Sequence, residues 1–146
     1  MQVYSFSEIS ENMYDDGYHN IINVDISSVV ISQMSKRNAK RDLMVYKQMD
    51  VRDLKYENGT FDLEIDKSTI DALLCGDHAF YNVAIMMKEI QRTLKVGGTY
   101  LAISYGKPEN RISHFVREFL SFEVCQFEIS APEDGKADDD EDRVWG

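Results

Sequence analysis

Three aspartates each stand at the end of a short apolar or alternating segment of this 146-residue chain. Asp25 follows the mainly apolar residues 21–24, Asp50 ends the segment LMVYKQMD, and Asp66 ends the segment FDLEID. A carboxylate offers two acceptor oxygens in one plane, so it can accept hydrogen bonds from both hydroxyls of a ribose. Aspartate is also common in turns, and this structural alternative stays open for all three. The pattern therefore predicts strand-end turns or a rim that holds an adenosine-containing ligand.

The segments that must position these aspartates alternate between helix and strand. Apolar spacing predicts strands over residues 21–25, 43–50, 61–66, 99–105 and 122–129. It predicts helices over residues 6–16, 27–38, 81–95 and 112–119. Ser5 or Ser7 could cap the first helix, Ser27 is placed to cap the second, and Gly97 and Gly98 are expected to end the third.

This alternation predicts an α/β fold in which helices cover both faces of a mostly parallel, Rossmann-like sheet. In such sheets ligands bind at the carboxyl ends of the strands, where the three aspartates are expected. One domain is predicted over residues 1–130. Residues 131–146 carry a block of acidic residues that self-repels, and they are predicted to form an acidic loop or tail.

Composition restricts the other possible functions. The net charge of −10 disfavours nucleic acid as a partner, and the basic residues 36–41 are explained by a helix C-terminus. Cys75 and Cys125 follow no metal-ligand spacing, so we expect no metal and interpret them as core-type thiols of a reduced, cytoplasmic protein. No apolar run approaches the roughly 18 residues that a membrane helix needs, so no membrane association is expected.

Longer segments carry a more specific pattern than the strand-end aspartates. These segments are YDDGYHNIINVDISSVVISQM, MDVRDL, FDLEIDKSTIDALL and LKVGGTYLAISY. They resemble class I S-adenosylmethionine-dependent methyltransferases. Within that class they are most similar to the branch of translation elongation factor 1A lysine methyltransferases and the related protein fused to an endothelin-converting enzyme. The resemblance extends over about residues 7–129.

The resemblance implies roles for individual residues along the cofactor, S-adenosylmethionine. Asp25 matches the acidic residue that holds the ribose, and Ile26 matches the apolar residue that packs on adenine. Asp50 matches the residue that approaches the adenine amino group, and Val51 offers a backbone amide beside it. These roles suit the residue chemistry, because carboxylates accept from hydroxyls and amines while an aliphatic side chain excludes water.

Asp66 and Lys67 match the start of the loop that lines the methionine end of the cofactor and the entrance for the methyl acceptor. Methyl transfer to nitrogen depends mainly on positioning, so no nucleophilic side chain is required and no catalytic residue is assigned. Tyr81 and Tyr105 could line an acceptor channel, although core packing is the favoured role for both. The histidines are interpreted as surface or helix-edge residues: His19, His78 and His114.

The resemblance also exposes a departure from the family pattern. The family shows an apolar strand and a glycine-rich turn about 20 residues before the ribose-binding acid, but this chain has no glycine before Gly17. We expect the amino-terminal strand to be largely missing, with residues 1–5 supplying a stub, or a partner chain filling the gap by strand exchange in a homodimer. The last hairpin strand is expected to be missing too, and this truncated form is expected to bind the cofactor weakly or not at all.

The resemblance implies an S-adenosylmethionine-dependent methyltransferase that acts on a lysine, or another nitrogen, of a protein such as a translation elongation factor. The alternative is a non-catalytic, methyltransferase-like interaction module, which the missing glycine turn favours. A nicotinamide-binding domain is a third possibility, and the same missing glycines count against it.

Overall fold

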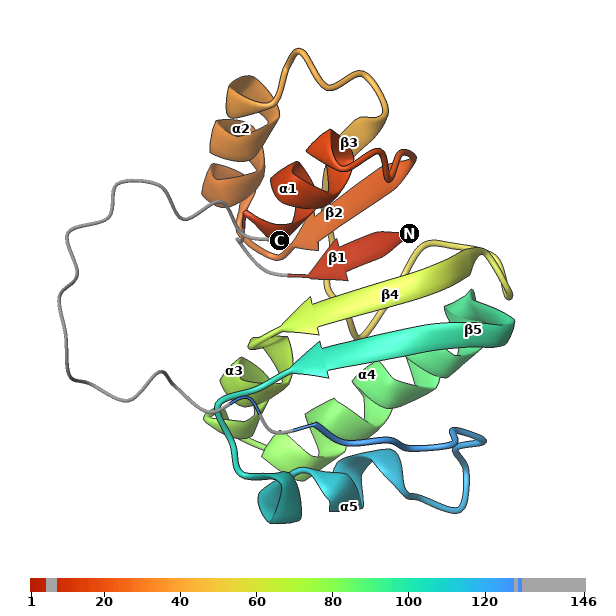
Figure 1. The fold of residues 1–146 in the computed structure, drawn as a ribbon. Coiled ribbons are helices and arrows are strands. Elements are labelled where there is room, and N and C mark those ends of the chain that lie inside the picture. Colours follow the sequence, from red (N-terminus) through yellow and green to blue (C-terminus); the bar gives the residue numbers. More distant parts are fainter. Residues whose placement is uncertain (5–7, 128, 130–146) are drawn as a thin grey trace, which may run out of the picture.

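The computed structural model describes residues 1–4, 8–127 and 129 (Figure 1). Its sheet consists of parallel strands in the order β3-β2-β1-β4-β5. The strands are β1 (Gln2–Tyr4), β2 (Ile21–Asp25), β3 (Met44–Gln48), β4 (Phe61–Lys67) and β5 (Leu94–Ile103). The predicted α/β class and Rossmann-like parallel sheet are confirmed. The predicted acidic tail at 131–146 lies outside the described residues.

Helices cover both faces of this sheet, as predicted. They are α1 (Ile9–Asp15), α2 (Ser28–Arg37), α3 (Thr69–Leu74), α4 (Ala79–Thr93), the 3-10 turn η1 (Pro108–Asn110) and α5 (Ile112–Phe115). In Figure 1, α1 and α2 lie beside β2 and β3, whereas α3 and α4 lie beside β4 and β5. Ser27 caps α2 as expected, because its hydroxyl accepts a hydrogen bond from the Val30 N–H at 3.3 Å.

Two apolar clusters hold the helices against the sheet. One joins Val24 of β2 and Phe61 of β4 to Ile70 of α3 and to the buried side of α4, which includes Met86 and Ile90. The other consists of buried Ile21, Met44 and Ile65, against which Ile9 and Met13 of α1 pack. Burial of such side chains contributes about 1.5–3 kcal/mol each. The apolar faces predicted from spacing therefore form the core on both sides of the sheet.

The three-residue strand β1 lies at the centre of the sheet. Tyr4 pairs with Val24 of β2 on one side and with Asp66 of β4 on the other. This strand is the stub predicted for residues 1–5, and it provides hydrogen-bonding partners to both inner edges. The central position of the sheet is therefore occupied, over residues 2–4, by a strand of the same chain. A strand exchanged from a partner chain was the predicted alternative.

Two predictions after residue 90 are wrong, and one helix was missed. Gly97 and Gly98 do not end α4 but lie inside β5, where Gly98 packs so closely that an added Cβ would lie 2.9 Å from the Lys95 carbonyl oxygen. The predicted helix at 112–119 is only the single turn α5, because Val116 leaves the helical conformation with φ −104° and ψ 79°. The six-residue helix α3 was not predicted.

The strand predicted over 122–129 is also wrong within the described residues, where 121–127 have no regular structure. A strand needs a neighbouring strand for its hydrogen bonds, and none of the described strands pairs with this segment. It is held by other means instead. The Ser121 N–H donates to the Gln91 side chain of α4 at 2.6 Å, and Phe122 packs near Tyr100 with ring centroids 6.3 Å apart.

Candidate functional site

The three strand-end aspartates lie at one edge of the sheet. Asp25 is the last residue of β2, Asp50 follows β3 by two residues, and Asp66 is the penultimate residue of β4. Because all the strands are parallel, their carboxyl ends meet at this edge. The register confirms the alignment, since Tyr4 pairs with both Val24 and Asp66. The structure thus places the aspartates where the sequence pattern predicted them, but their side chains differ in what they contact.

Within the described part of the chain, Asp25 has one carboxylate oxygen without a hydrogen-bond donor. Its Oδ1 accepts a hydrogen bond from the Ser27 N–H at 2.8 Å, whereas Oδ2 accepts none from the described residues. Ile26 follows directly, and its apolar side chain is 64% exposed. Residues at the end of β3 hold the loop that follows β2. The Met49 N–H donates to the Asp25 carbonyl at 3.0 Å, and the Gln48 side chain donates to the Ile26 carbonyl at 3.1 Å. A fixed loop therefore presents an acceptor oxygen and an aliphatic surface together.

The carboxylate of Asp50 is already bound by Arg52. The guanidinium of Arg52 donates to both oxygens at 2.6–3.1 Å, and the Arg52 N–H donates to Oδ1 at 2.9 Å. These side-chain hydrogen bonds lower the pKa of Asp50. Arg52 also donates to the side chain of Asn82 in α4 at 2.9 Å. A ligand amine therefore competes with Arg52 for Asp50. Sequence reasoning missed this competitor, although its two-residue spacing from Asp50 is typical of an Asx turn.

Val51 plays two parts in this loop. Its side chain is buried in the larger apolar cluster, which anchors the loop after β3. Its backbone N–H makes no hydrogen bond to any of the described residues. The predicted backbone donor is thus present, and no group within the described part of the chain competes for it.

Asp66 is completely buried and caps α3. Its Oδ1 accepts from the Thr69 N–H at 2.7 Å, and its Oδ2 accepts from the Ile70 N–H and the Tyr100 hydroxyl at 3.1 Å each. Burial raises the pKa of Asp66 despite these hydrogen bonds, which act in the opposite direction. Both oxygens are occupied, so in this structure the side chain stabilises the first turn of α3. Its predicted contact with a cofactor stays a prediction.

The residues after Asp66 form a tight turn at the same edge. Lys67 ends β4, and its ammonium forms no ion pair with the described residues. Ser68 adopts the left-handed conformation with φ 66°, which costs a non-glycine residue about 1 kcal/mol or more. The Ser68 N–H donates to the Ile103 carbonyl at the end of β5 at 2.9 Å. This hydrogen bond joins the turn after β4 to the segment after β5.

Two further residues at this edge were missed by sequence reasoning. Asp71 of α3 and Arg111, which precedes α5, form an ion pair with an N–O distance of 2.8 Å. Ser104, after β5, donates its hydroxyl to Asp71 at 2.6 Å. No local pattern could have shown this contact, because Arg111 lies 40 residues from Asp71 in the chain.

The histidine and tyrosine predictions need correction. His114 is not a surface residue but is 2% exposed, because its ring stacks on Phe80 at a centroid distance of 5.3 Å. Burial lowers the pKa of His114, and Arg117 and Arg111 act in the same direction. Tyr81 and Tyr105 do not pack in the core but are exposed, by 68% and 94%. Their exposure leaves the rings of both tyrosines open to a partner molecule.

The cysteine prediction also needs correction. Cys75 and Cys125 are free and exposed rather than core thiols, because Cys75 ends α3 and Cys125 lies in the irregular segment after α5. Within the described residues no three metal-ligating side chains gather as a metal site would require. None of the helices in that part of the chain combines the length and apolar composition needed to span a membrane.

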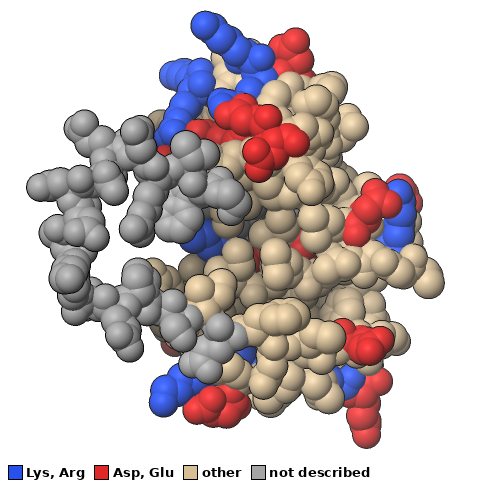
Figure 2. All heavy atoms as spheres, in the orientation of Figure 1, with Lys and Arg blue, Asp and Glu red and all other residues tan. Residues whose placement is uncertain are grey.

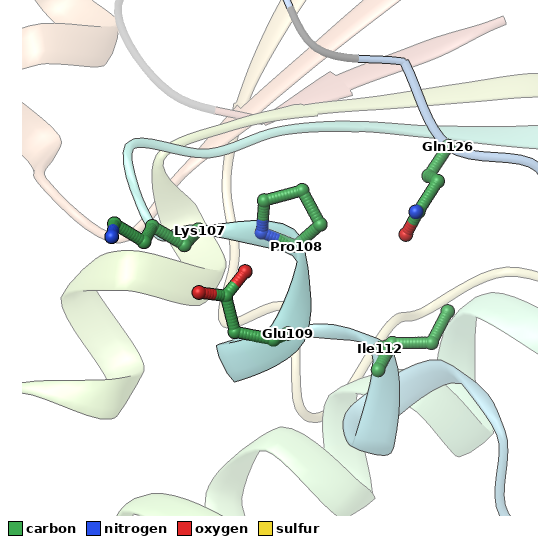
Figure 3. A pocket seen from close by; sticks show the side chains of 5 residues that line it. All are labelled: Lys107, Pro108, Glu109, Ile112 and Gln126. Carbon is green, nitrogen blue, oxygen red and sulfur yellow. The ribbon is translucent and has the colours of Figure 1, made fainter.

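A hollow of about 630 Å³ lies beyond the end of β5 (Figure 3). Figure 3 shows Ile112 and Gln126 facing one another across it, while Lys107 points away. It lies on the side of α5 and not among the three aspartates. The side chains that line it are Lys107, Pro108, Glu109, Ile112 and Gln126.

Charged side chains are mixed on the face of the molecule seen in Figure 2. Basic side chains gather at the top of this face beside acidic ones. Arg37 pairs with Glu11 at 2.8 Å, and Arg41 pairs with Asp15 at 2.6 Å. Two of the four basic side chains of residues 36–41 are thus paired with acidic residues of α1.

Comparison with known protein families agrees with this arrangement. Residues 6–102 match the family model described as a methyltransferase domain. The chain belongs to this methyltransferase family. The match begins three residues before α1 and ends within β5, so the matched domain includes Asp25, Asp50 and Asp66.

Curated relatives of this methyltransferase domain share its sequence over most of its length. It is 42% identical over 118 residues to the mouse (Mus musculus) eEF1A lysine and N-terminal methyltransferase, an alignment that covers 77% of this chain and 17% of that protein. It is 31% identical over 119 residues to the mouse EEF1A lysine methyltransferase 4, covering 76% of this chain and 47% of that protein. The chain therefore spans less than half the length of either relative.

A solved structure supports the fold. The SAM-dependent methyltransferase from Methanosarcina mazei superposes with a TM-score of 0.61 at 17% identity, covering 77% of this chain and 56% of that one. At this identity the similarity concerns the fold alone. It places the parallel sheet and flanking helices of this methyltransferase domain among those of solved methyltransferases.

Proposed function

We propose that this methyltransferase domain binds S-adenosylmethionine at the carboxyl edge of its sheet and serves methyl transfer to a lysine side chain of a protein. One observation carries the proposal: on a fixed loop beside exposed Ile26, Asp25 has a carboxylate oxygen that accepts no hydrogen bond from the described residues. The names of both mouse relatives point to elongation factor 1A as the protein substrate. We therefore propose translation elongation factor 1A as the acceptor.

The residues present fit the cofactor. The free oxygen of Asp25 suits a ribose hydroxyl, and the aliphatic side chain of Ile26 suits one face of adenine. The Val51 N–H can donate to a ring nitrogen of the base, next to Asp50. Lys67 has an ammonium available for the carboxylate at the methionine end of the cofactor. We propose that Asp66 acts indirectly, by holding the turn that carries Lys67.

The cofactor supplies an electrophilic methyl group on a sulfonium. The protein's contribution is to fix the two reactants in line and to keep water out, and such positioning can contribute about 7–11 kcal/mol of barrier reduction. Asp25 and Ile26 orient the adenosine end, whereas the segments after β4 and β5 border the place where the acceptor enters. Positioning the cofactor and the acceptor in this way requires no nucleophilic side chain.

Proposals on the partners and the location of the protein follow from its charge and its cysteines. We propose no nucleic acid partner, because the net charge of −10 would repel phosphates. Two free cysteines are typical of a reducing compartment, and we propose the cytoplasm as the location.

Isothermal titration with S-adenosylhomocysteine tests the cofactor site. In the Asp25→Asn variant we expect the affinity to fall roughly 10- to 150-fold, because a hydrogen bond to a charged group contributes about 1.5–3 kcal/mol. Asp42→Asn is the matched control, since Asp42 is an exposed aspartate that precedes β3 at the opposite edge of the sheet. Equal affinity of the Asp25→Asn variant and the wild-type protein would reduce Asp25 to a turn residue.

Incorporation of a labelled methyl group tests the acceptor. Recombinant elongation factor 1A is incubated with the protein and methyl-labelled S-adenosylmethionine, and mass spectrometry locates the label. We expect the label on a lysine. Absence of any labelled product, with the cofactor bound, would contradict the proposed substrate.

A further inference from the structure

The segment after β5 is tied to α3 by a single carboxylate. Oδ1 of Asp71 accepts from the Ser104 hydroxyl at 2.6 Å and from the Arg111 guanidinium at 2.8 Å. Oδ2 of the same carboxylate accepts from the Tyr105 backbone N–H at 3.1 Å. Each contact joins α3 to a different residue of the segment 104–111, so the segment is held at both of its ends.

The backbone of this segment is shaped around the guanidinium. Nε of Arg111 donates to the Ser104 hydroxyl at 2.9 Å, and the Gly106 N–H donates to the same oxygen at 3.1 Å. A Cβ added at Gly106 would lie 2.1 Å from Cζ of Arg111, so a side chain at this position would displace the guanidinium. The side chains of Asp71 and Arg111 are 18% and 20% exposed, which limits screening of the pair by water.

The lowered pKa of Asp71 is consistent with its ion pair with Arg111. Burial raises the pKa of this carboxyl, but the hydrogen bonds from Ser104 and Arg111 outweigh burial and leave the pKa lowered. The carboxylate therefore remains charged at neutral pH and holds all of its donors. We refer to Asp71, Ser104, Gly106 and Arg111 together as the clamp.

The clamp fixes the backbone of a tyrosine whose ring is almost wholly exposed. Tyr105 is 94% exposed, although its own N–H is bound to Asp71. It stands two residues beyond Ile103, which pairs with Lys67 at the end of β4. The backbone of Tyr105 thus lies at the carboxyl edge of the sheet, near the turn after β4. A large aromatic ring exposed on a fixed backbone at this edge is suited to contact a second molecule.

We propose that Tyr105 recognises the acceptor lysine and that Asp71 and Arg111 are positioning residues that hold the tyrosine in place. The face of a tyrosine ring attracts an ammonium group by cation–π interaction and packs against the methylene stem of lysine. This inference rests on the proposed function, because it assigns a recognition residue to the same transfer reaction.

A binding measurement without cofactor tests the role of Tyr105. Recombinant elongation factor 1A is immobilised, and its affinity for each variant is measured by biolayer interferometry. We expect Tyr105→Leu to bind roughly 2- to 30-fold more weakly than Tyr105→Phe, which keeps an aromatic face. Tyr18→Leu is the matched control, since Tyr18 is an exposed tyrosine before β2 at the opposite edge. Equal affinities of the Leu and Phe variants would overturn the assignment.

Steady-state kinetics tests the positioning residues. In Arg111→Lys and Gly106→Ala we expect the KM for elongation factor 1A to rise about 3- to 30-fold, since the fork geometry of arginine is lost or displaced. The dissociation constant of S-adenosylhomocysteine should stay within about twofold, because the clamp joins α3 to the segment after β5, whereas Asp25 ends β2. An unchanged KM, or a cofactor affinity that falls in step with KM, would overturn the positioning role.

The two proposals fail in different ways. If the wild-type protein binds no S-adenosylhomocysteine and transfers no methyl group, the proposed function is wrong. If binding of elongation factor 1A nevertheless depends on an aromatic ring at Tyr105, the recognition role stands by itself. Normal transfer by the Tyr105→Leu variant, with unchanged KM, would refute the further inference and leave the proposed function intact.

Discussion

Replacing the buried carboxylate of Asp66 by an amide tests whether this residue supports the fold or the ligand. In Asp66→Asn one oxygen becomes an NH₂ group. If it takes the place of Oδ1 it faces the Thr69 N–H, and if it takes the place of Oδ2 it faces the Ile70 N–H. Either orientation leaves one backbone donor without an acceptor: the buried Ile70 N–H or the partly buried Thr69 N–H. The variant therefore loses a hydrogen bond that no rotation of the side chain can restore.

The expected change in the free energy of unfolding of Asp66→Asn is the sum of opposing contributions. A buried unsatisfied donor costs about 1–3 kcal/mol, and the remaining hydrogen bonds lose their charge assistance, which is worth roughly another 1 kcal/mol. Removing the charge also relieves its burial, which is the reason that the pKa of Asp66 is raised. This relief offsets part of the loss, and we expect a decrease of about 2 kcal/mol in the free energy of unfolding. For a domain of this size that corresponds to a decrease in Tm of roughly 6–10 °C.

Urea unfolding followed by circular dichroism at pH 7 measures the effect. Asp62→Asn is the matched control, because Asp62 lies in the same strand but is exposed and paired only with Lys95 at the surface, so we expect no measurable change. Unaltered stability of Asp66→Asn would show that the cap on α3 contributes nothing. Unaltered stability together with lost affinity for S-adenosylhomocysteine would assign Asp66 to the ligand and refute its structural role.

Three further substitutions test the close packing at Gly98, the buried His114 and the hydrogen-bonded carboxylate of Asp50. Gly98→Ala forces a Cβ to within 2.9 and 3.1 Å of two backbone oxygens. We expect a loss of about 1–3 kcal/mol in urea unfolding. Because burial lowers the pKa of His114, its stabilising contribution is present above the unfolded pKa near 6.5 and is lost as pH falls through the lower folded value. Unfolding midpoints should therefore decrease more steeply from pH 7 to 5 for the wild-type protein than for His114→Gln, and parallel profiles would contradict the assignment. Arg52→Gln removes the guanidinium from the Asp50 carboxylate and keeps the backbone N–H of residue 52 on Oδ1. Titration calorimetry should therefore show an affinity for S-adenosylhomocysteine roughly 2- to 10-fold higher, and a decrease would show that Arg52 itself supports the ligand.

Local patterns in the sequence predicted most of the sheet. The segments before Asp25, Asp50 and Asp66 alternate or run apolar over a few residues, and each is followed by turn-forming residues, so a strand and its end are encoded nearby. Ser27 could be recognised as a cap because its bond partner Val30 is only three residues away. The strand predicted over 122–129 failed for the opposite reason, since apolar alternation cannot supply the neighbouring strand on which hydrogen bonding depends.

The sequence by itself determined that acidic groups stand at the ends of parallel strands, and its similarity to methyltransferases determined the family. Only the tertiary structure decided which of these groups keeps an oxygen for a ligand. Asp66 is occupied partly because Tyr100, 34 residues away, donates to it, and Arg52 is held against Asp50 with help from Asn82, 30 residues away. Such partners meet only when strands and helices pack. Burial and competition for hydrogen bonds are properties of the folded neighbourhood and not of any local segment.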